Sequence, residues 1–172
     1  MDAAAICAIY NHYIENTIIS FEEKPLLTEE AEERIRKISA KYPYLVWEQE
    51  SERPAGGGAE GLCAGEILGF ACINTWKERS AYRFSAELSI YIRDGFQGRG
   101  MGSKLMEKLL EEVRKTDIHA LVSGIALPND RSVSLHEKFG FKKIALFREI
   151  GRKLNKWLDV GYWELIVNKE SS

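Results

Sequence analysis

The sequence has few of the residues that build disulfide frameworks and metal centres. It contains three cysteines, and because the number is odd and none forms a CxxC pair, neither a disulfide framework nor a zinc site is indicated. Its three histidines are too scattered for a histidine-rich metal motif. We therefore expect no metal, and a reducing cytoplasm is the expected location.

Long apolar runs and an excess of charge are also absent. No apolar run approaches the roughly 18 residues that span a membrane, and the initial stretch MDAAAICAIYNHYI lacks the basic start of a signal peptide. A formal net charge of -2 argues against a general nucleic-acid binder, which is usually basic. The 45% apolar and 29% charged residues are typical of a single globular domain over residues 1–172.

The hydrophobic pattern predicts a mixed α/β chain. Helices are expected at residues 3–14, 28–40, 101–116 and 128–140. Strands are expected at residues 44–50, 66–76, 84–92, 119–127, 141–150 and 156–167. The glycine-rich stretch 51–65 is predicted to be a long hairpin loop. Two helices, a β-meander and then alternating helices and strands predict one layered structure.

The stretch IYIRDGFQGRGMGSKLMEKLLEEV joins a strand to an amphipathic helix through Gly95, Gly98, Gly100 and Gly102. A strand, a glycine turn and a helix N-terminus together form an anion site in many proteins. A Walker A loop needs GxxxxGK[ST], but Met101 follows Gly100 here. A Rossmann fingerprint needs GxGxxG in the first βαβ unit, but here the spacing is GxGxG and two helices precede it. A loop of N–H groups that holds a pyrophosphate without metal remains, beside a turn that only joins strand and helix.

Two ordered motifs indicate the family that this chain resembles. QGRGMG, from Gln97 to Gly102, matches the [RQ]-x-x-G-x-[GA] signature of the GNAT acetyltransferases. NDRSVSLHEKFGF, residues 129–141, resembles the second GNAT signature, N-x-x-[SA]-x-x-L-[YH]-[EKR]-x-x-G-F. AYRFSAELSIYIRDGFQGRG and GRKLNKWLDVGYWEL are similar to the phosphinothricin and methionine sulfoximine N-acetyltransferase branch. The resemblance covers nearly all of the chain.

This resemblance implies the GNAT fold, a central mixed and mostly antiparallel sheet flanked by helices. The family usually begins with a short strand. Here the first predicted helix begins almost at Met1, so the first edge strand is expected to be missing. The glycine loop at 51–65 is longer than usual, and Leu88 stands where the branch has histidine, which bears on the choice of substrate.

The resemblance implies acetyl-CoA as the acyl donor. The N–H groups of residues 98–103 would surround the pyrophosphate at the positive end of the helix, and residues 90–92 would pair with the pantetheine arm. The cofactor-binding residues expected on this basis are Ile90, Tyr91, Ile92, Gln97, Gly98, Arg99, Gly100, Met101, Gly102, Ser103, Asn129, Ser132 and Lys138.

The implied acceptor is a primary amine, which must lose a proton before it attacks a thioester. Glu87 is the expected general base, and the alternative is an outward-facing residue of an alternating strand. His136 stands where many GNAT enzymes have a tyrosine that protonates the leaving thiolate, and a packing role is its alternative. N–H groups near Ile90 and Tyr91 would hold the oxyanion if this strand separates from its neighbour.

The predicted acceptor is a small amino-acid-like amine such as phosphinothricin, methionine sulfoximine or methionine sulfone. Cations in the 77–83 loop suit an α-carboxylate, although a solvated basic loop is the alternative, above all for Arg79. The expected substrate-binding residues are Phe21, Trp76, Lys77, Arg79, Arg83, Glu87, Ser89 and Asn129.

Two rival functions remain open at this point. One is acetylation of a protein N-terminus, as in the ribosomal-protein branch, and the other is a non-catalytic acyl-CoA sensor. A homodimer is expected, because exposed sheet edges invite pairing and related enzymes are commonly dimers.

Overall fold

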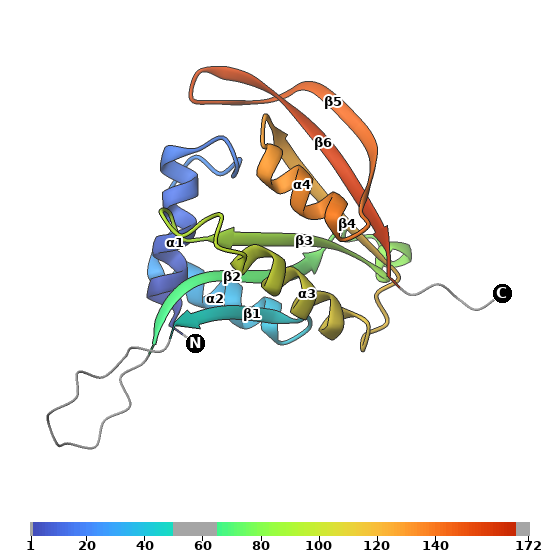
Figure 1. Ribbon diagram of the computed structural model, residues 1–172, viewed down its shortest axis with the longest axis horizontal. Helices are drawn as coiled ribbons and strands as arrows, with labels where there is room; N and C mark the ends of the chain where they lie inside the picture. Colours follow the sequence, from blue (N-terminus) through green and yellow to red (C-terminus); the bar gives the residue numbers. More distant parts are fainter. Residues whose placement is uncertain (1, 50–64, 168–172) are drawn as a thin grey trace, which may run out of the picture.

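The computed structural model describes residues 2–49 and 65–167 (Figure 1). Its helices are α1 (Ala3–Asn16), α2 (Thr28–Ser39), α3 (Met101–Val113) and α4 (Asp130–Lys138), with a short 3-10 helix η1 (Ser80–Tyr82). Its strands are β1 (Tyr44–Gln49), β2 (Glu66–Thr75), β3 (Ser85–Ile92), β4 (Ala120–Leu127), β5 (Lys142–Lys153) and β6 (Lys156–Ile166). Apart from Gly65, the expected glycine loop lies outside the described residues. Among the helices described, none has the length and apolar character needed to cross a membrane.

The strands form one sheet in the order β1-β2-β3-β4-β6-β5. Only β3 and β4 run parallel, and the other four neighbouring pairs are antiparallel. The predicted mixed and mostly antiparallel sheet is therefore confirmed. No strand precedes α1 in the described part of the chain, so β1 forms one edge of the sheet and β5 forms the other.

Helices cover both faces of this sheet, as Figure 1 shows. On one face, α3 buries Met106, Leu109 and Val113 completely, since their spacing of three and four residues places them on one side of the helix. On the other face, α1 and α2 pack against β2, and Ile9 and Tyr13 of α1 belong to this second cluster. The sheet is thus buried over its central strands.

A bulge sets which β2 side chains face α1 and α2. Trp47 of β1 lies opposite Gly69, but the next residue, Glu48, lies opposite Ile67, so that Leu68 is an extra residue on β2. An extra residue reverses the alternation of side chains along a strand. The residues that follow Gly69 therefore present their even-numbered side chains to the α1 and α2 face.

The structure corrects the predicted end of β5. The strand was expected to stop at residue 150 and residues 151–155 to form the connection, because glycine often marks a turn. Instead β5 continues to Lys153, and the turn consists of Leu154 and Asn155 alone. Both have positive φ, 49° and 60°, which is the backbone of a two-residue hairpin turn matched to the twist of its strands.

We predict that the α3 face of the core carries much of the stability. Leu109→Ala should lower the free energy of unfolding by about 2–5 kcal/mol, because it removes a completely buried side chain and leaves a cavity. Denaturant unfolding measures this change. Glu107→Ala, an exposed site on the same helix, serves as the control and should change stability by less than about 0.5 kcal/mol. An equal loss of unfolding free energy in the two variants would contradict the stabilising role of the α3 face.

Candidate active site

The site is organised by the point at which β3 and β4 separate. Their parallel pairing covers three residue pairs and ends at Glu87, which lies opposite Val122. Beyond it, the hydroxyl of Ser123 donates to the carbonyl of Leu88 at 3.3 Å, in place of a main-chain bond. From there on, β3 has no strand partner on its β4 side in the part of the chain that the structure describes. Main-chain groups there can bind an extended ligand as a strand would.

Two cavities meet at this separation. The large cavity, about 920 Å³, is lined by α1, α2, β2 and β3 together with residues 19–22. The loop cavity, about 640 Å³, follows β3 to the glycine turn and the start of α3. Six residues line both of them: Ile19, Leu88, Ser89, Tyr91, Gly124 and Ala126. A molecule in one cavity can therefore meet a molecule in the other beside β3.

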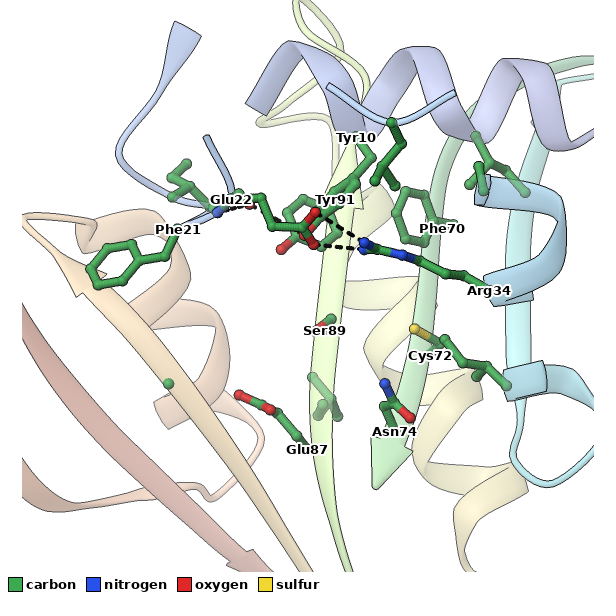
Figure 2. Close-up of a pocket in the computed structure, with 18 of the residues that line it drawn as sticks. Tyr10, Phe21, Glu22, Arg34, Phe70, Cys72, Asn74, Glu87, Ser89 and Tyr91 are labelled. Atoms are coloured by element: carbon green, nitrogen blue, oxygen red, sulfur yellow. Dashed lines mark hydrogen bonds and ion pairs between the residues drawn. The ribbon is translucent and has the colours of Figure 1, made fainter. Parts of the chain in front are cut away.

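Three cross-strand pairs form one wall of the large cavity (Figure 2). Each pair has one residue from β2 and one from β3, directly opposite in the antiparallel register: Phe70 with Tyr91, Cys72 with Ser89, and Asn74 with Glu87. The wall changes from aromatic at one end to polar at the other. Glu87 lies at the polar end, just before β3 leaves β4.

The aromatic end of the cavity holds an ion pair that sequence reasoning missed. The Arg34 guanidinium donates to both carboxylate oxygens of Glu22, at 2.6 and 3.1 Å, and the Tyr10 hydroxyl donates to one of them at 2.9 Å. Burial acts to raise the pKa of Glu22, but these hydrogen bonds outweigh it and leave the pKa below its ordinary value. No local motif could reveal a pair formed between a loop and a helix.

Glu87 has the opposite environment. It is half-buried and accepts no hydrogen bond within the described residues. Burial raises the pKa of its carboxyl, and the charge of Lys77 opposes this only in part. A methyl group built on Gly124 would lie 3.7 Å from a Glu87 carboxylate oxygen and 3.2 Å from the Tyr162 ring. Glycine at this position therefore keeps the space beside Glu87 open.

The structure brings together only some of the predicted substrate residues. Those that line the large cavity are Phe21, Glu87 and Ser89, whereas Asn129 lines the loop cavity. Trp76 lines neither cavity, and its ring centroid lies 5.7 Å from that of Tyr162, a residue of the large cavity. The Lys77 ammonium lies 5.0 Å from the centre of the Trp76 ring. Lys77 therefore acts on the site through its charge.

Arg79 and Arg83 are not among the residues that line either cavity, and their contact with substrate stays a prediction. Arg79 precedes η1 and is exposed. The Arg83 guanidinium lies 4.2 Å from the centre of the Phe84 ring and donates to the Ser80 carbonyl at 3.3 Å. The 3-10 helix and the Phe84 ring thus hold this cation at the loop itself, which the sequence spacing could not show.

The loop cavity contains every predicted cofactor residue except Arg99. Gly98 and Gly100 have φ of 79° and 82°, and a methyl group added to either would meet no atom within 4 Å. Gly100 directly precedes α3, whose first turn has no acidic residue. A concave run of N–H groups at a helix N-terminus with open space before it fits a pyrophosphate.

Of the two cations expected at this cavity, Lys138 lines it and Arg99 does not. Arg99 turns away and donates to the Gly95 carbonyl at 3.2 Å. Lys138 lines the cavity and donates to the Ser103 hydroxyl at 3.2 Å, and Arg131, which sequence reasoning missed, also lines it. Positive charge at the loop cavity thus comes from α4 rather than from the glycine loop.

His136 is buried beside the loop cavity. Its Nδ1 lies 2.7 Å from the Ser132 carbonyl oxygen, and because that oxygen can only accept, Nδ1 carries the hydrogen. Its Nε2 is buried and has no partner among the described residues. Burial lowers the pKa of the imidazole, so the neutral ring is favoured. The predicted role as proton donor requires the protonated ring, which this environment disfavours.

Comparison with known sequences identifies the family. A profile described as the acetyltransferase (GNAT) family matches residues 8–141. The chain is 34% identical over 163 residues to the phosphinothricin N-acetyltransferase of Streptomyces viridochromogenes, covering 95% of this chain and 81% of that protein. It is 29% identical over 175 residues to the L-methionine sulfoximine/L-methionine sulfone acetyltransferase of Salmonella typhimurium, covering 99% and 92%.

Solved structures agree with the sequence comparison. The phosphinothricin acetyltransferase of Sinorhizobium meliloti, solved in complex with acetyl-CoA, has a TM-score of 0.88 and 26% identity, with 99% of this chain and 85% of that chain covered. The chain therefore belongs to the acetyltransferase (GNAT) family, and the enzyme class predicted from its two signatures is confirmed.

We predict that Gly100→Val raises the Michaelis constant for acetyl-CoA at least about tenfold, since the side chain would occupy the space before the N–H groups. Gly95→Val is a matched control, because Gly95 has a similar φ of 79° but does not line the loop cavity. It should suffer similar backbone strain and keep its coenzyme affinity. Titration calorimetry with coenzyme A compares the two variants, and equal affinity in both would refute the pyrophosphate assignment.

Proposed function

We propose that the chain transfers an acetyl group from acetyl-CoA to the primary amine of a small amino-acid-like acceptor, with Glu87 as general base. One observation carries this proposal. Glu87 lines the large cavity next to Ser89 and Gly124, which line both cavities. An amine held in the large cavity would lose its proton to Glu87 at the place where the two cavities join.

The environment of Glu87 suits a base. A carboxylate with an ordinary pKa is a weak acceptor of protons at neutral pH, and a raised pKa improves the match. Burial raises the pKa of Glu87, while the nearby Lys77 limits the rise and keeps the ionised form accessible. Glu22, in the same cavity, has a lowered pKa and is fully engaged by Arg34 and Tyr10. Only one of the two carboxylates is therefore free to accept a proton.

The loop cavity suits the donor, which supplies an activated thioester. N–H groups of residues 98–103 would bind the pyrophosphate, with Lys138 and Arg131 adding charge. The unpaired side of β3 would bind the extended arm through main-chain groups, and N–H groups near Ile90 and Tyr91 would stabilise the oxyanion.

The cysteines of the large cavity support direct transfer over a covalent acetyl-enzyme. Cys7 and Cys72 both line this cavity. Burial raises the pKa of Cys72 to about 12 and also raises that of Cys7. Since the thiolate is the nucleophilic form, neither residue is activated at neutral pH.

The acceptor side of the proposal is amino-acid-like amines. Phosphinothricin, methionine sulfoximine and methionine sulfone each have an α-amine, an α-carboxylate and a polar tetrahedral group. Lys77 would attract the α-carboxylate near Glu87, and the polar and aromatic walls of the large cavity would surround the rest. The acceptor class is tested by measuring coenzyme A release with these three compounds, with peptides and with no acceptor. Turnover with peptides alone would replace it by N-terminal acetylation, and tight coenzyme A binding without turnover would replace it by a sensor.

We predict that Glu87→Gln slows turnover about a hundredfold or more, the usual scale for loss of a general base, with little change in acetyl-CoA binding. The acidic limb of the pH–rate profile should disappear with it. Glu78→Gln, the same change at an exposed site outside both cavities, is the control and should keep normal turnover. Near-normal turnover of Glu87→Gln on every active acceptor would require another base.

The same variant should be more stable than the wild type at neutral pH. The folded pKa of Glu87 lies above the ordinary 4.5, so the folded protein binds the proton more tightly than the unfolded chain, and stability falls as pH rises through this window. Glutamine removes that loss. Thermal unfolding should show a higher midpoint for Glu87→Gln at pH 7 and no gain below pH 4.5. A lower midpoint at pH 7 would mean that the ionised carboxylate stabilises the fold.

We also propose a homodimer formed through the β5–β6 hairpin. β5 is an edge strand, and the hairpin exposes several large apolar side chains, which are Ile144, Leu146, Phe147, Ile150, Leu154 and Trp157. Exposed edges and apolar patches of this kind mark association surfaces.

Sedimentation velocity at micromolar concentration should give twice the mass of one chain. Trp157→Glu should shift the protein toward monomer, because Trp157 is 61% exposed on this surface. Leu27→Glu changes a comparably exposed residue outside the hairpin, at 66%, and should leave the assembly intact. A monomeric wild type would rule out the dimer.

A further inference from the structure

The far end of β5 reaches the segment that covers the large cavity. Residues 17–22, the covering segment, follow α1 and contribute Ile19, Ser20, Phe21 and Glu22 to the cavity lining. Phe21 is 43% exposed and lies across the cavity from Phe70 in Figure 2. The segment itself belongs to no helix or strand, so its position depends on side-chain contacts.

A bulge gives β5 the reach for this contact. Its register with β6 shifts between Phe147 and Gly151. Within the bulge, Glu149 has a φ of 48°, and its N–H donates to the Asp159 carboxylate at 2.8 Å. Bulges bend a strand and redirect the residues that follow. The residues redirected here are 151–153.

Gly151 is packed against the covering segment. A methyl group built on it would lie within 3.0 Å of three ring atoms of Phe21. Because the obstructing atoms belong to a half-exposed side chain and not to backbone, any side chain at 151 would displace the ring rather than disrupt the fold. Glycine at 151 thus allows Phe21 its position in the cavity wall.

Lys153 holds the same segment by hydrogen bonds. It is 5% exposed and has no carboxylate within ion-pair distance among the described residues. Its ammonium donates to the carbonyl of Ser20 and to that of Tyr13, the latter at 3.4 Å. Burial lowers its pKa, and the charges of Glu23 and Glu22 oppose this. A buried lysine whose hydrogen-bond acceptors are two carbonyls fixes the backbone that carries them.

The covering segment is itself connected to the ion pair of the cavity. The Ser20 hydroxyl donates to the Tyr10 hydroxyl at 3.2 Å and accepts the N–H of Glu22 at 3.2 Å. A displacement of Ser20 would therefore shift its hydrogen-bond partners Tyr10 and Glu22, and with them Arg34, at one end of the cavity. The contacts of β5 thus bear on the shape and the charge of the acceptor side, since four residues of the covering segment line the large cavity.

We propose that Gly151 and Lys153 are positioning residues that set the affinity for the acceptor by holding residues 17–22 over the large cavity. This inference rests on the proposed function, since it assigns the large cavity to the acceptor. Neither residue lines either cavity, so both act through the covering segment. Their effect should appear in acceptor binding and not in the chemistry at Glu87.

A double-mutant cycle between Gly151 and Phe21 tests the packing contact. Gly151→Ala should raise the Michaelis constant for the best acceptor about fivefold or more, with a smaller change for acetyl-CoA, because it moves the Phe21 ring. In a Phe21→Ala background there is no ring to displace, and Gly151→Ala should then change this constant less than about twofold. An equal effect in both backgrounds, or none in either, overturns the proposal.

Lys153→Met tests the hydrogen bonds, and exposed Lys156→Met in the same hairpin is its control. Lys153→Met should raise the Michaelis constant for the acceptor at least about fivefold, with a smaller change in kcat. Lys156→Met should leave this Michaelis constant unchanged. Should Lys153→Met fail to fold, the Gly151 cycle decides alone. A wild type that acetylates no amine would refute the proposed function, whereas an active wild type with unchanged acceptor constants in the variants would refute only the positioning role.

Discussion

The separation of β3 from β4 after Glu87 is the constraint on which the site depends. Each of these strands keeps an antiparallel partner on its other side, β2 for β3 and β6 for β4, so the gap opens without loss of either ladder. The Ser123 hydroxyl replaces one main-chain bond at the start of the gap. Because a backbone group away from water needs a partner, the unpaired side of β3 can bind an extended chain. Five of the six residues that line both cavities belong to β3 or β4.

The electrostatics of the large cavity follow from which carboxylate has a partner. Glu22 accepts hydrogen bonds from Arg34 and Tyr10, and its pKa falls. Glu87 accepts none from the described residues, and its pKa rises. When two carboxyl groups have pKa values moved apart by their environments, the one with the lowered pKa is typically a structural charge and the one with the raised pKa is suited to proton transfer. A charge left without hydrogen bonds weakens the fold, and such a cost is typical of a residue retained for its chemistry.

The hairpin of β5 and β6 brings a late part of the chain into contact with an early segment at one cavity. Lys153 and Ser20 are 133 residues apart in sequence and share a hydrogen bond. The bulge at Glu149 directs residues 151–153 toward the covering segment, while the exposed apolar residues of the same hairpin form an association surface. One element therefore joins the proposed dimer contact to the wall of the large cavity.

Much of the fold and most of the lining of the loop cavity were predictable because their signals are local. Helical periodicity identified the buried face of α3, and the glycines before it predicted an anion site, since both inferences depend on neighbours within a few residues. The second signature placed Asn129, Ser132 and Lys138 at the same cavity, because a strand and a helix in sequence order can pack there in few ways.

Only the tertiary structure decided the contacts between segments that are distant in the sequence. The Glu22–Arg34 pair joins a loop to a helix, and the hydrogen bond from Lys153 to the Ser20 carbonyl joins the last hairpin to the segment after the first helix. The direction of Arg83 depends on a short 3-10 turn, and the length of β5 depends on its register with β6. Residue type and spacing determine which side chains share a face of one element. Which faces meet depends on how the elements pack, and here that packing decided the lining of the large cavity.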